Sequence, residues 1–154
     1  MQKVVLSKTI EEPIYHFSLQ DMLPSGHSLV LNLPFGTLLY LKSDSSLPRL
    51  VRQEQFTRTE MSVLLPLLEF FPYYCPHEVL YASFYSNGKV NEANTADARR
   101  YLGEAEKNGS WEQEVRPVRC ALSRTRLKVR PFGMDISSIL ATGYILQVGL
   151  RRSS

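Results

Sequence analysis

The sequence predicts an α+β fold with an N-terminal antiparallel β-sheet, a three-helix core and a C-terminal β-hairpin. Three observations predict it. Short β-prone segments separated by turn signals fill residues 1–55. The apolar spacing changes from two residues to a helical period near Thr57. An arginine-rich helical segment then leads into two further β-prone segments at 136–148. We therefore expect a β-rich segment, residues 1–55, packed on a second unit, residues 56–150.

The N-terminal segment contains two strong strand candidates, residues 29–33 and 37–41, because the residues between them, 34–36, read Pro-Phe-Gly and favour a turn. Residues 4–6 and 14–17 are weaker strand candidates. Residues 49–53 alternate between apolar and polar side chains enough to be a further strand. Together these segments predict a small antiparallel sheet.

Thr57 or Thr59 can cap the first helix, and Glu60, three residues after Thr57, completes a capping box with Thr57. Apolar residues then recur at helical spacing up to residue 71, and Pro72 ends the helix. Pro66 lies inside this pattern, where proline is expected to kink a helix or mark a boundary. A short second helix is expected over residues 77–84, and a polar surface helix over 95–107.

The basic helix has two candidate starts. Ser110 and Gln113 could form a capping box, but Pro117 would then interrupt the helix. A start near Val115 places Pro117 in the first turn, and we prefer it for that reason. Beyond the helix, residues 136–140 and 144–148 are joined by a short turn and predict a hairpin.

The net charge of +3 conceals a basic C-terminal third. Residues 112–154 hold eight Lys or Arg and three Asp or Glu, so they carry +5, whereas residues 58–111 hold five and seven and carry −2. Such asymmetry is an electrostatic footprint for a polyanion, and DNA is the first candidate.

Several classes of function find no support in the sequence. There is no apolar run long enough for a membrane span, and residues 1–15 lack the pattern of a signal peptide, so we expect a cytoplasmic protein. Cys75 and Cys120 are expected to be two buried thiols, with no disulfide. No metal-ligand spacing, phosphate-binding loop or catalytic triad is visible, so we expect neither a cofactor nor an enzyme.

Four segments of the chain carry a resemblance to a known family: 56–72 (FTRTEMSVLLPLLEFFP), 77–85 (HEVLYASFY), 115–129 (VRPVRCALSRTRLKV) and 136–146 (ISSILATGYIL). In this order they resemble the OmpR-type winged-helix effector domains of bacterial response regulators, and the resemblance covers roughly residues 28–148. The resemblance implies a winged helix-turn-helix whose last helix enters the DNA major groove, while the hairpin wing touches the neighbouring backbone. The roughly 50 residues before the first helix are too few for a receiver domain of ~120 residues, so the chain is expected to be a free-standing effector or a fragment.

The resemblance places the DNA contacts on the basic helix and the wing. Arg119 and Lys128, the other two cations of the helix, are included in the predicted site because of their charge. The predicted DNA-binding residues are Arg116, Arg119, Cys120, Ala121, Ser123, Arg124, Arg126 and Lys128 of the helix, and Ser138, Leu140 and Tyr144 of the wing. The chain departs from the family at Arg119, where an acid is frequent, at Thr125, where leucine is preferred, and at Leu140, where a wing arginine is common.

These observations favour a sequence-specific regulator of transcription that binds double-stranded DNA. Because the family contacts RNA polymerase between its second and third helices, residues 86–110 are expected to be a partner surface, on an insert. A homodimer and a monomer both remain open. The alternative is a winged-helix interaction module, whose basic face docks on an acidic protein in a larger assembly. In a third interpretation the arginines only form the solvent-exposed face of a surface helix and bind no partner.

Overall fold

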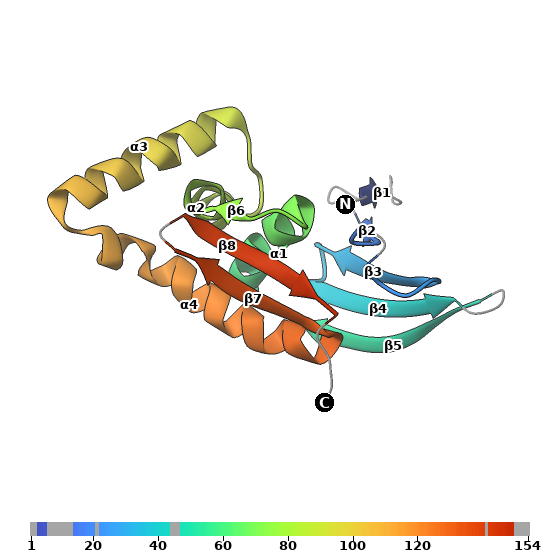
Figure 1. The fold of residues 1–154 in the computed structure, drawn as a ribbon. Helices are drawn as coiled ribbons and strands as arrows, with labels where there is room; N and C mark the ends of the chain where they lie inside the picture. The colour runs from blue at the N-terminus through green and yellow to red at the C-terminus, as the bar shows by residue number, and fades with distance from the viewer. Residues whose placement is uncertain (1–2, 6–13, 21, 44–46, 141, 150–154) are drawn as a thin grey trace.

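The computed structural model describes residues 3–5, 14–20, 22–43, 47–140 and 142–149. Over these residues the chain forms a five-stranded antiparallel sheet, four α-helices and a three-stranded sheet (Figure 1), which is a mixed α+β fold as expected. The elements are β1 (Lys3–Val5), β2 (Ile14–Phe17), β3 (His27–Asn32), β4 (Thr37–Ser43), β5 (Pro48–Gln55), α1 (Arg58–Phe70), β6 (Cys75–Pro76), α2 (His77–Tyr85), α3 (Glu92–Asn108), α4 (Trp111–Val129), the 3-10 turn η1 (Arg130–Phe132), β7 (Met134–Ile139) and β8 (Gly143–Val148).

The N-terminal sheet has its strands in sequence order, β1 to β5, and every pair is antiparallel. The predicted strands at 29–33 and 37–41 correspond to β3 and β4, with Leu31 opposite Leu38. The expected strand 4–6 corresponds to β1, and Leu6 lies outside the described residues. Buried residues of the sheet, including Leu29, Leu31 and Leu38, share one core cluster with Leu64 of α1, so sheet and helices are packed together.

Helix α1 begins with the predicted capping box. The Glu60 amide donates to the Thr57 hydroxyl at 3.2 Å, and the Thr57 amide donates to the Glu60 carboxylate at 2.9 Å. The helix runs through Pro66 to Phe70. Because Pro66 has no N–H, it leaves the carbonyl of Ser62 without its helical partner. The buried hydroxyl of Ser83, from α2, donates to that carbonyl, so the proline is accommodated without an unpaired buried acceptor.

Helix α4 begins at Trp111, so the preferred start near Val115 was wrong. Pro117 lies inside the helix, and the Ser110 side chain makes no capping hydrogen bond. Tertiary contacts explain the longer helix: Val115 is buried, and the Tyr101 hydroxyl of α3 donates to Glu114 at 2.8 Å. These contacts hold the first turns in place although Pro117 removes one helical hydrogen bond.

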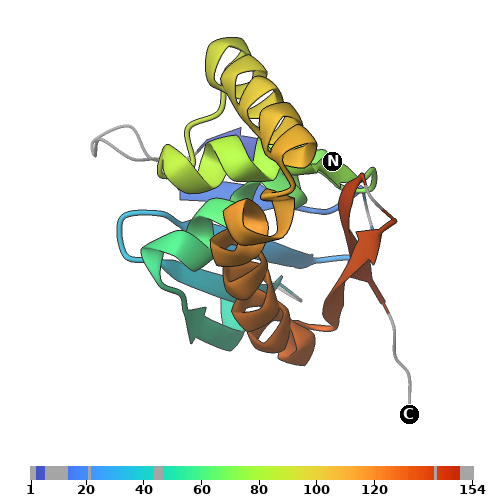
Figure 2. The ribbon, with the colours of Figure 1, turned by 90° about the vertical axis from the view of Figure 1, so that its left-hand side faces the viewer.

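Helix α3 is the expected surface helix, and it begins three residues earlier than predicted. Mutual hydrogen bonds between Asn91 and Asn94 cap its start, and Gly109 ends it in the left-handed conformation. It buries a narrow stripe against α2, made of Ala98, Leu102 and Ala105. Figures 1 and 2 show α3 projecting from the rest of the helical layer.

The predicted hairpin is formed by β7 and β8, which pair from Met134–Val148 to Ile139–Gly143. Leu140 falls outside β7, in the turn. No pattern in the sequence predicts β6, a two-residue strand that pairs with β8. Through β6, the hairpin is attached to the connection between α1 and α2.

Candidate nucleic-acid interface

Helix α4 is amphipathic, and its outer face carries most of the predicted DNA-binding residues. The inner face buries Val115, Val118, Ala121, Leu122, Thr125 and Val129. Figure 2 shows the helix running along the surface of the molecule, with the hairpin beside it. A helix exposed along one side, next to a two-stranded hairpin, is geometrically able to lie in a DNA groove.

A groove of about 380 Å³ lies between α4 and the hairpin. Leu122 of the helix and Ile136 of β7 contribute apolar side chains to it. Five predicted residues from both elements line it: Arg119, Ser123, Arg126, Ser138 and Tyr144. The structure therefore brings together two guanidinium groups and three hydroxyl groups that lie up to 25 residues apart in the sequence. All of these groups can donate hydrogen bonds to phosphate oxygens.

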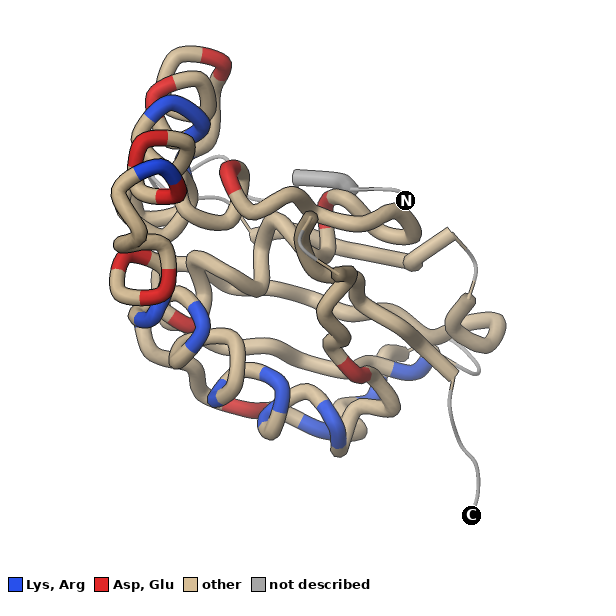
Figure 3. The backbone as a smooth tube through the Cα atoms, turned by 60° about the vertical axis from the view of Figure 1, so that its left-hand side comes forward, with Lys and Arg blue, Asp and Glu red and all other residues tan. Residues whose placement is uncertain are grey.

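Three acidic side chains pair with cations of α4 and offset much of their charge. Figure 3 shows acidic positions, in red, close to the basic positions, in blue. Glu112 pairs with Arg119 at 2.5 Å from within the helix. Glu60 and Asp135 come from α1 and β7. The sequence shows no acid between Glu114 and Asp135, so the approach of Glu60 could not be read from local charge.

Glu60 is buried, with 1% of its surface exposed, and it faces two cations of α4. Its carboxylate accepts from Arg124 Nε at 3.2 Å and from Lys128 Nζ at 2.8 Å. Burial would raise the pKa of Glu60, but the contacts with Lys128, the Thr57 amide and Arg124 prevail and hold the pKa below its ordinary value. Glu60 is therefore ionised, and its ion pairs hold the start of α1 against α4.

Lys128 also donates to the carbonyl of Gln55 at 2.8 Å, and its ammonium lies 5.3 Å from the centre of the Phe56 ring. Its side chain is 31% exposed. These contacts tie α4 to the end of the N-terminal sheet. Lys128 therefore has a structural role that the sequence prediction missed.

Asp135, from β7, pairs with two other cations at the same C-terminal end of α4. Two hydrogen bonds from Arg126, at 2.7 and 3.3 Å, reach its two carboxylate oxygens, and Arg130 lies at 3.6 Å. The hydrogen bond with Arg126 is the main cause that lowers the pKa of Asp135. This pairing joins the helix to β7. Arg130, which the sequence prediction omitted, lies beside the same carboxylate and so joins the cations at the end of α4.

Arg116 differs from the other arginines of α4, because it has no hydrogen-bond or ion-pair partner among the described residues. Cys120 and Ser123 are exposed along the same side of α4. Leu127 is 65% exposed there and was not predicted, although helical spacing from Ser123 points to it. Leu140, at 91% exposure, lies at the end of the hairpin.

Two sequence expectations are corrected by burial. Ala121 is fully buried, so its side chain cannot contact a ligand from the surface. It belongs to the stripe of Val118 and Leu122, and its carbonyl accepts from the Thr125 hydroxyl at 2.7 Å. Cys75 is buried as expected, but Cys120 is exposed and not a second buried thiol, because it lies on the outer face of α4.

We expect Glu60→Gln to lower the free energy of unfolding by about 1–3 kcal/mol at pH 7, because it removes a buried charge from Arg124 and Lys128. The effect falls below that of a fully buried pair because the two cations are partly exposed. The folded pKa of Glu60 lies below its ordinary 4.5, so the unfolded chain binds the proton first as the pH falls. The stabilisation by ionised Glu60 is therefore fully present at a pH above the pKa of the unfolded state. It is lost as the pH falls through the pKa of the folded state.

Chemical denaturation at pH 7 and pH 3 measures this prediction. The difference between wild type and Glu60→Gln should shrink at pH 3. The exposed Glu104, on α3, offers a control, and Glu104→Gln should change stability by less than about 0.5 kcal/mol. An undiminished difference at pH 3 would assign the loss to packing and not to charge.

Comparisons with protein-family models, curated proteins and solved structures gave no match to this chain. Among the described residues, no group of three or more His, Cys, Asp or Glu is arranged to hold a metal ion. No helix in the described part of the chain combines the length and the hydropathy needed to cross a bilayer.

Proposed function

We propose that the protein is a transcription regulator that binds specific sequences of double-stranded DNA through a winged helix-turn-helix. In this proposal α1, α2 and α4 are the three core helices, β7 and β8 form the wing, and α3 is the insert. The observation that carries the proposal is the groove between α4 and the hairpin, where Arg119, Arg126 and four hydroxyl side chains converge.

The geometry suits a helix in the major groove with the DNA backbone beside it. Cys120, Ser123 and Arg124 lie on the exposed side of α4 and would face base edges, whereas Arg116 would hold a phosphate. The groove between helix and wing would take the sugar-phosphate backbone, where donors hold the protein in register. Tyr144 and Ser138 would supply the wing's share of these contacts.

The charge of the surface is lower than the sequence suggests but keeps its sign. Six cations, the four arginines at 116, 119, 124 and 126 together with Lys128 and Arg130, face four acids, the paired Glu60, Glu112 and Asp135 and also Glu114 of α4, which leaves +2. The ion pairs also restrain the guanidinium groups before binding. Arg124, for example, donates to Glu60 through Nε and is 53% exposed, so its two terminal nitrogens can reach a guanine or a phosphate.

Helix α3 is the proposed surface for a protein partner, in line with RNA polymerase in the resembling family. It packs on α2, and none of its residues lines the groove between α4 and the hairpin. Its outer surface carries charges of both signs (Figure 3). Glu106, near the end of α3, lines another hollow together with Arg119, Ser138, Leu140 and Tyr144. A partner would therefore avoid the DNA only if it contacted the rest of α3.

A second candidate function is docking of an acidic protein on the same α4 surface. Two large apolar side chains favour it, because Leu127 and Leu140 are both well exposed. Protein interfaces bury such residues, whereas a phosphate backbone offers them little. On DNA, Leu127 would instead need a thymine methyl group as its partner.

Two single substitutions test the assignment of roles on α4. If Arg124 reads a base, Arg124→Ala should cost about 1–3 kcal/mol on a selected duplex and relax the preference at one base pair. Arg116→Ala should weaken all duplexes alike and flatten the salt dependence by about one unit, because a phosphate contact carries no sequence information.

Titration of each variant against a selected and a scrambled duplex, at two or more salt concentrations, separates these outcomes. If both variants bind every duplex as the wild type does, the DNA surface is not on α4. Retained binding of an acidic protein partner by the wild type would then support the docking function.

A further inference from the structure

A second concave site lies on the molecule, between the N-terminal sheet, α1 and the connection from α2 to α3. It is a cavity of about 500 Å³ and shares no lining residue with the groove beside α4. This volume lies in the range of small-molecule sites, about 300–1,000 Å³. A duplex is too wide to enter a cavity of this size, so the proposed DNA function does not use it.

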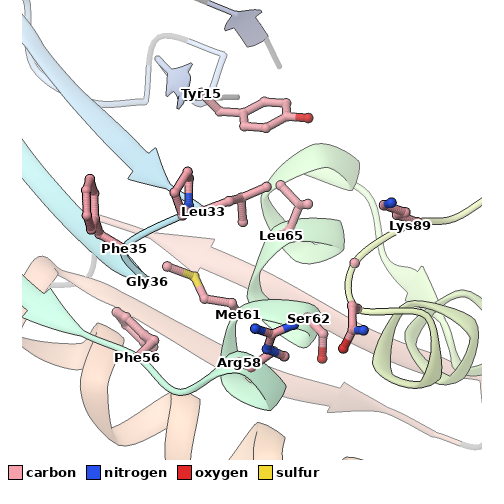
Figure 4. A pocket seen from close by; sticks show the side chains of 13 residues that line it. Tyr15, Leu33, Phe35, Gly36, Phe56, Arg58, Met61, Ser62, Leu65 and Lys89 are labelled. Atoms are coloured by element: carbon pink, nitrogen blue, oxygen red, sulfur yellow. The ribbon is translucent and has the colours of Figure 1, made fainter. Parts of the chain in front are cut away.

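The cavity is largely apolar on one side. Leu33 and Leu65 approach each other from the sheet and from α1, with Met61 and Phe56 beside them (Figure 4). Met61, Phe56 and Leu65 are at most 5% exposed, so they form a fixed apolar wall and not a loose surface patch. An apolar wall of this kind favours a ligand with a hydrocarbon or aromatic body.

Two cations complete the lining. Arg58 is the first residue of α1, and Lys89 follows the turn after α2. Neither side chain has a hydrogen-bond or ion-pair partner among the described residues, and no Asp or Glu belongs to the lining. The backbone of Lys89 is held in place, since its N–H donates to Ser86 and its carbonyl accepts from Asn94. The described residues of the lining thus carry two positive charges and no negative one.

We propose that this cavity binds a small organic acid, with its apolar body against Leu33, Met61 and Leu65 and its anionic group between Arg58 and Lys89. The anion would supply the counter-charge that the lining lacks. Because the ligand would contact the N-terminal sheet, α1 and the connection from α2 to α3 at once, it would stabilise the packing of these three parts. The carboxylates of alkyl and aromatic acids share this chemistry.

The test uses the full chain and two acids of different body, decanoate and 1-naphthoate, with decanol as the uncharged counterpart of decanoate. Binding is followed by amide NMR, where Gly36 and Gly88 report on the cavity, and Gly109 and Gly133 report on distant surfaces. We expect saturable shifts at Gly36 and Gly88, and an affinity for decanoate about tenfold above that for decanol. The ratio of decanoate to naphthoate affinity identifies the preferred body.

Arg58→Gln and Lys89→Gln should each weaken decanoate binding about fivefold or more and leave decanol binding unchanged. Lys107→Gln, which removes an exposed cation from α3, is the matched control and should bind as the wild type does. Lys89 is exposed in a connection, so its replacement tests the proposal even if Arg58→Gln impairs folding.

Equal affinity for decanoate and decanol, or decanoate binding that ignores both substitutions, would overturn the proposal. So would shifts that do not include Gly36 and Gly88. No DNA enters this experiment, so its failure leaves the proposed function of α4 untouched.

Discussion

Gly143→Ala is expected to lower the free energy of unfolding by about 3 kcal/mol or more. A Cβ atom at this position would lie 2.1 Å from the carbonyl oxygen of Cys75 and 2.9 Å from the Cα atom of Pro76. Both neighbours are backbone atoms, so no side chain can turn aside to make room. The pairing of β8 with β6 must open, and the hairpin then loses its attachment to the connection between α1 and α2.

Urea denaturation measures this loss, and Gly103→Ala is the matched control. Gly103 lies in α3, where an added Cβ would meet no atom within 4 Å, so the same substitution there should stabilise the protein by about 0.5–1 kcal/mol through helix propensity. If Gly143→Ala folds with wild-type stability, the close approach of β6 and β8 is wrong.

Replacing Arg116, Arg119 and Arg124 by Gln together is expected to weaken duplex binding by a factor of about 100 or more. All three side chains leave α4 on its exposed face. Each lost phosphate contact also removes about one unit from the dependence of log K on log salt, so the loss of Arg116 and Arg119 should flatten the dependence by about two units. The protein should remain folded, since none of the three is buried and Lys128 still pairs with Glu60.

The control carries the same change of charge at another place. Arg99, Arg100 and Lys107 lie exposed on α3, and their replacement by Gln should leave specific duplex binding within about threefold at moderate salt, where distant charges are screened. Anisotropy titrations of the two triple variants against one labelled duplex compare them. Equal losses would mean that net charge, and not the α4 surface, governs binding.

Features that depend on neighbouring residues could be predicted from the sequence. The capping box of Thr57 and Glu60, the turn between β3 and β4 and the hairpin each rest on contacts within a few residues. The stripe of helical spacing in α4 could also have excluded Ala121, because it falls between Val118 and Thr125 on the buried side. The family resemblance assigned it to DNA, and the spacing was the better guide.

Features that depend on distant contacts could not be predicted. Glu60 meets Arg124 across 64 residues, and no local pattern shows that the two will be neighbours. Strand β6 has only two residues and exists because β8 pairs with it. The early start of α4 depends on Tyr101 and on burial of Val115, which outweigh the local effect of Pro117. In each case tertiary packing overrides the local signal.

The measurement that tests the proposed function most directly is the salt dependence of duplex binding by the unmodified chain. Random duplexes are first selected on the protein, and the selected and scrambled sequences are then titrated from ~50 to ~200 mM salt. The DNA function predicts that affinity falls by several decades over this range and that the selected duplex binds more tightly throughout. A folded protein that selects no sequence and binds no duplex at ~50 mM salt would contradict it.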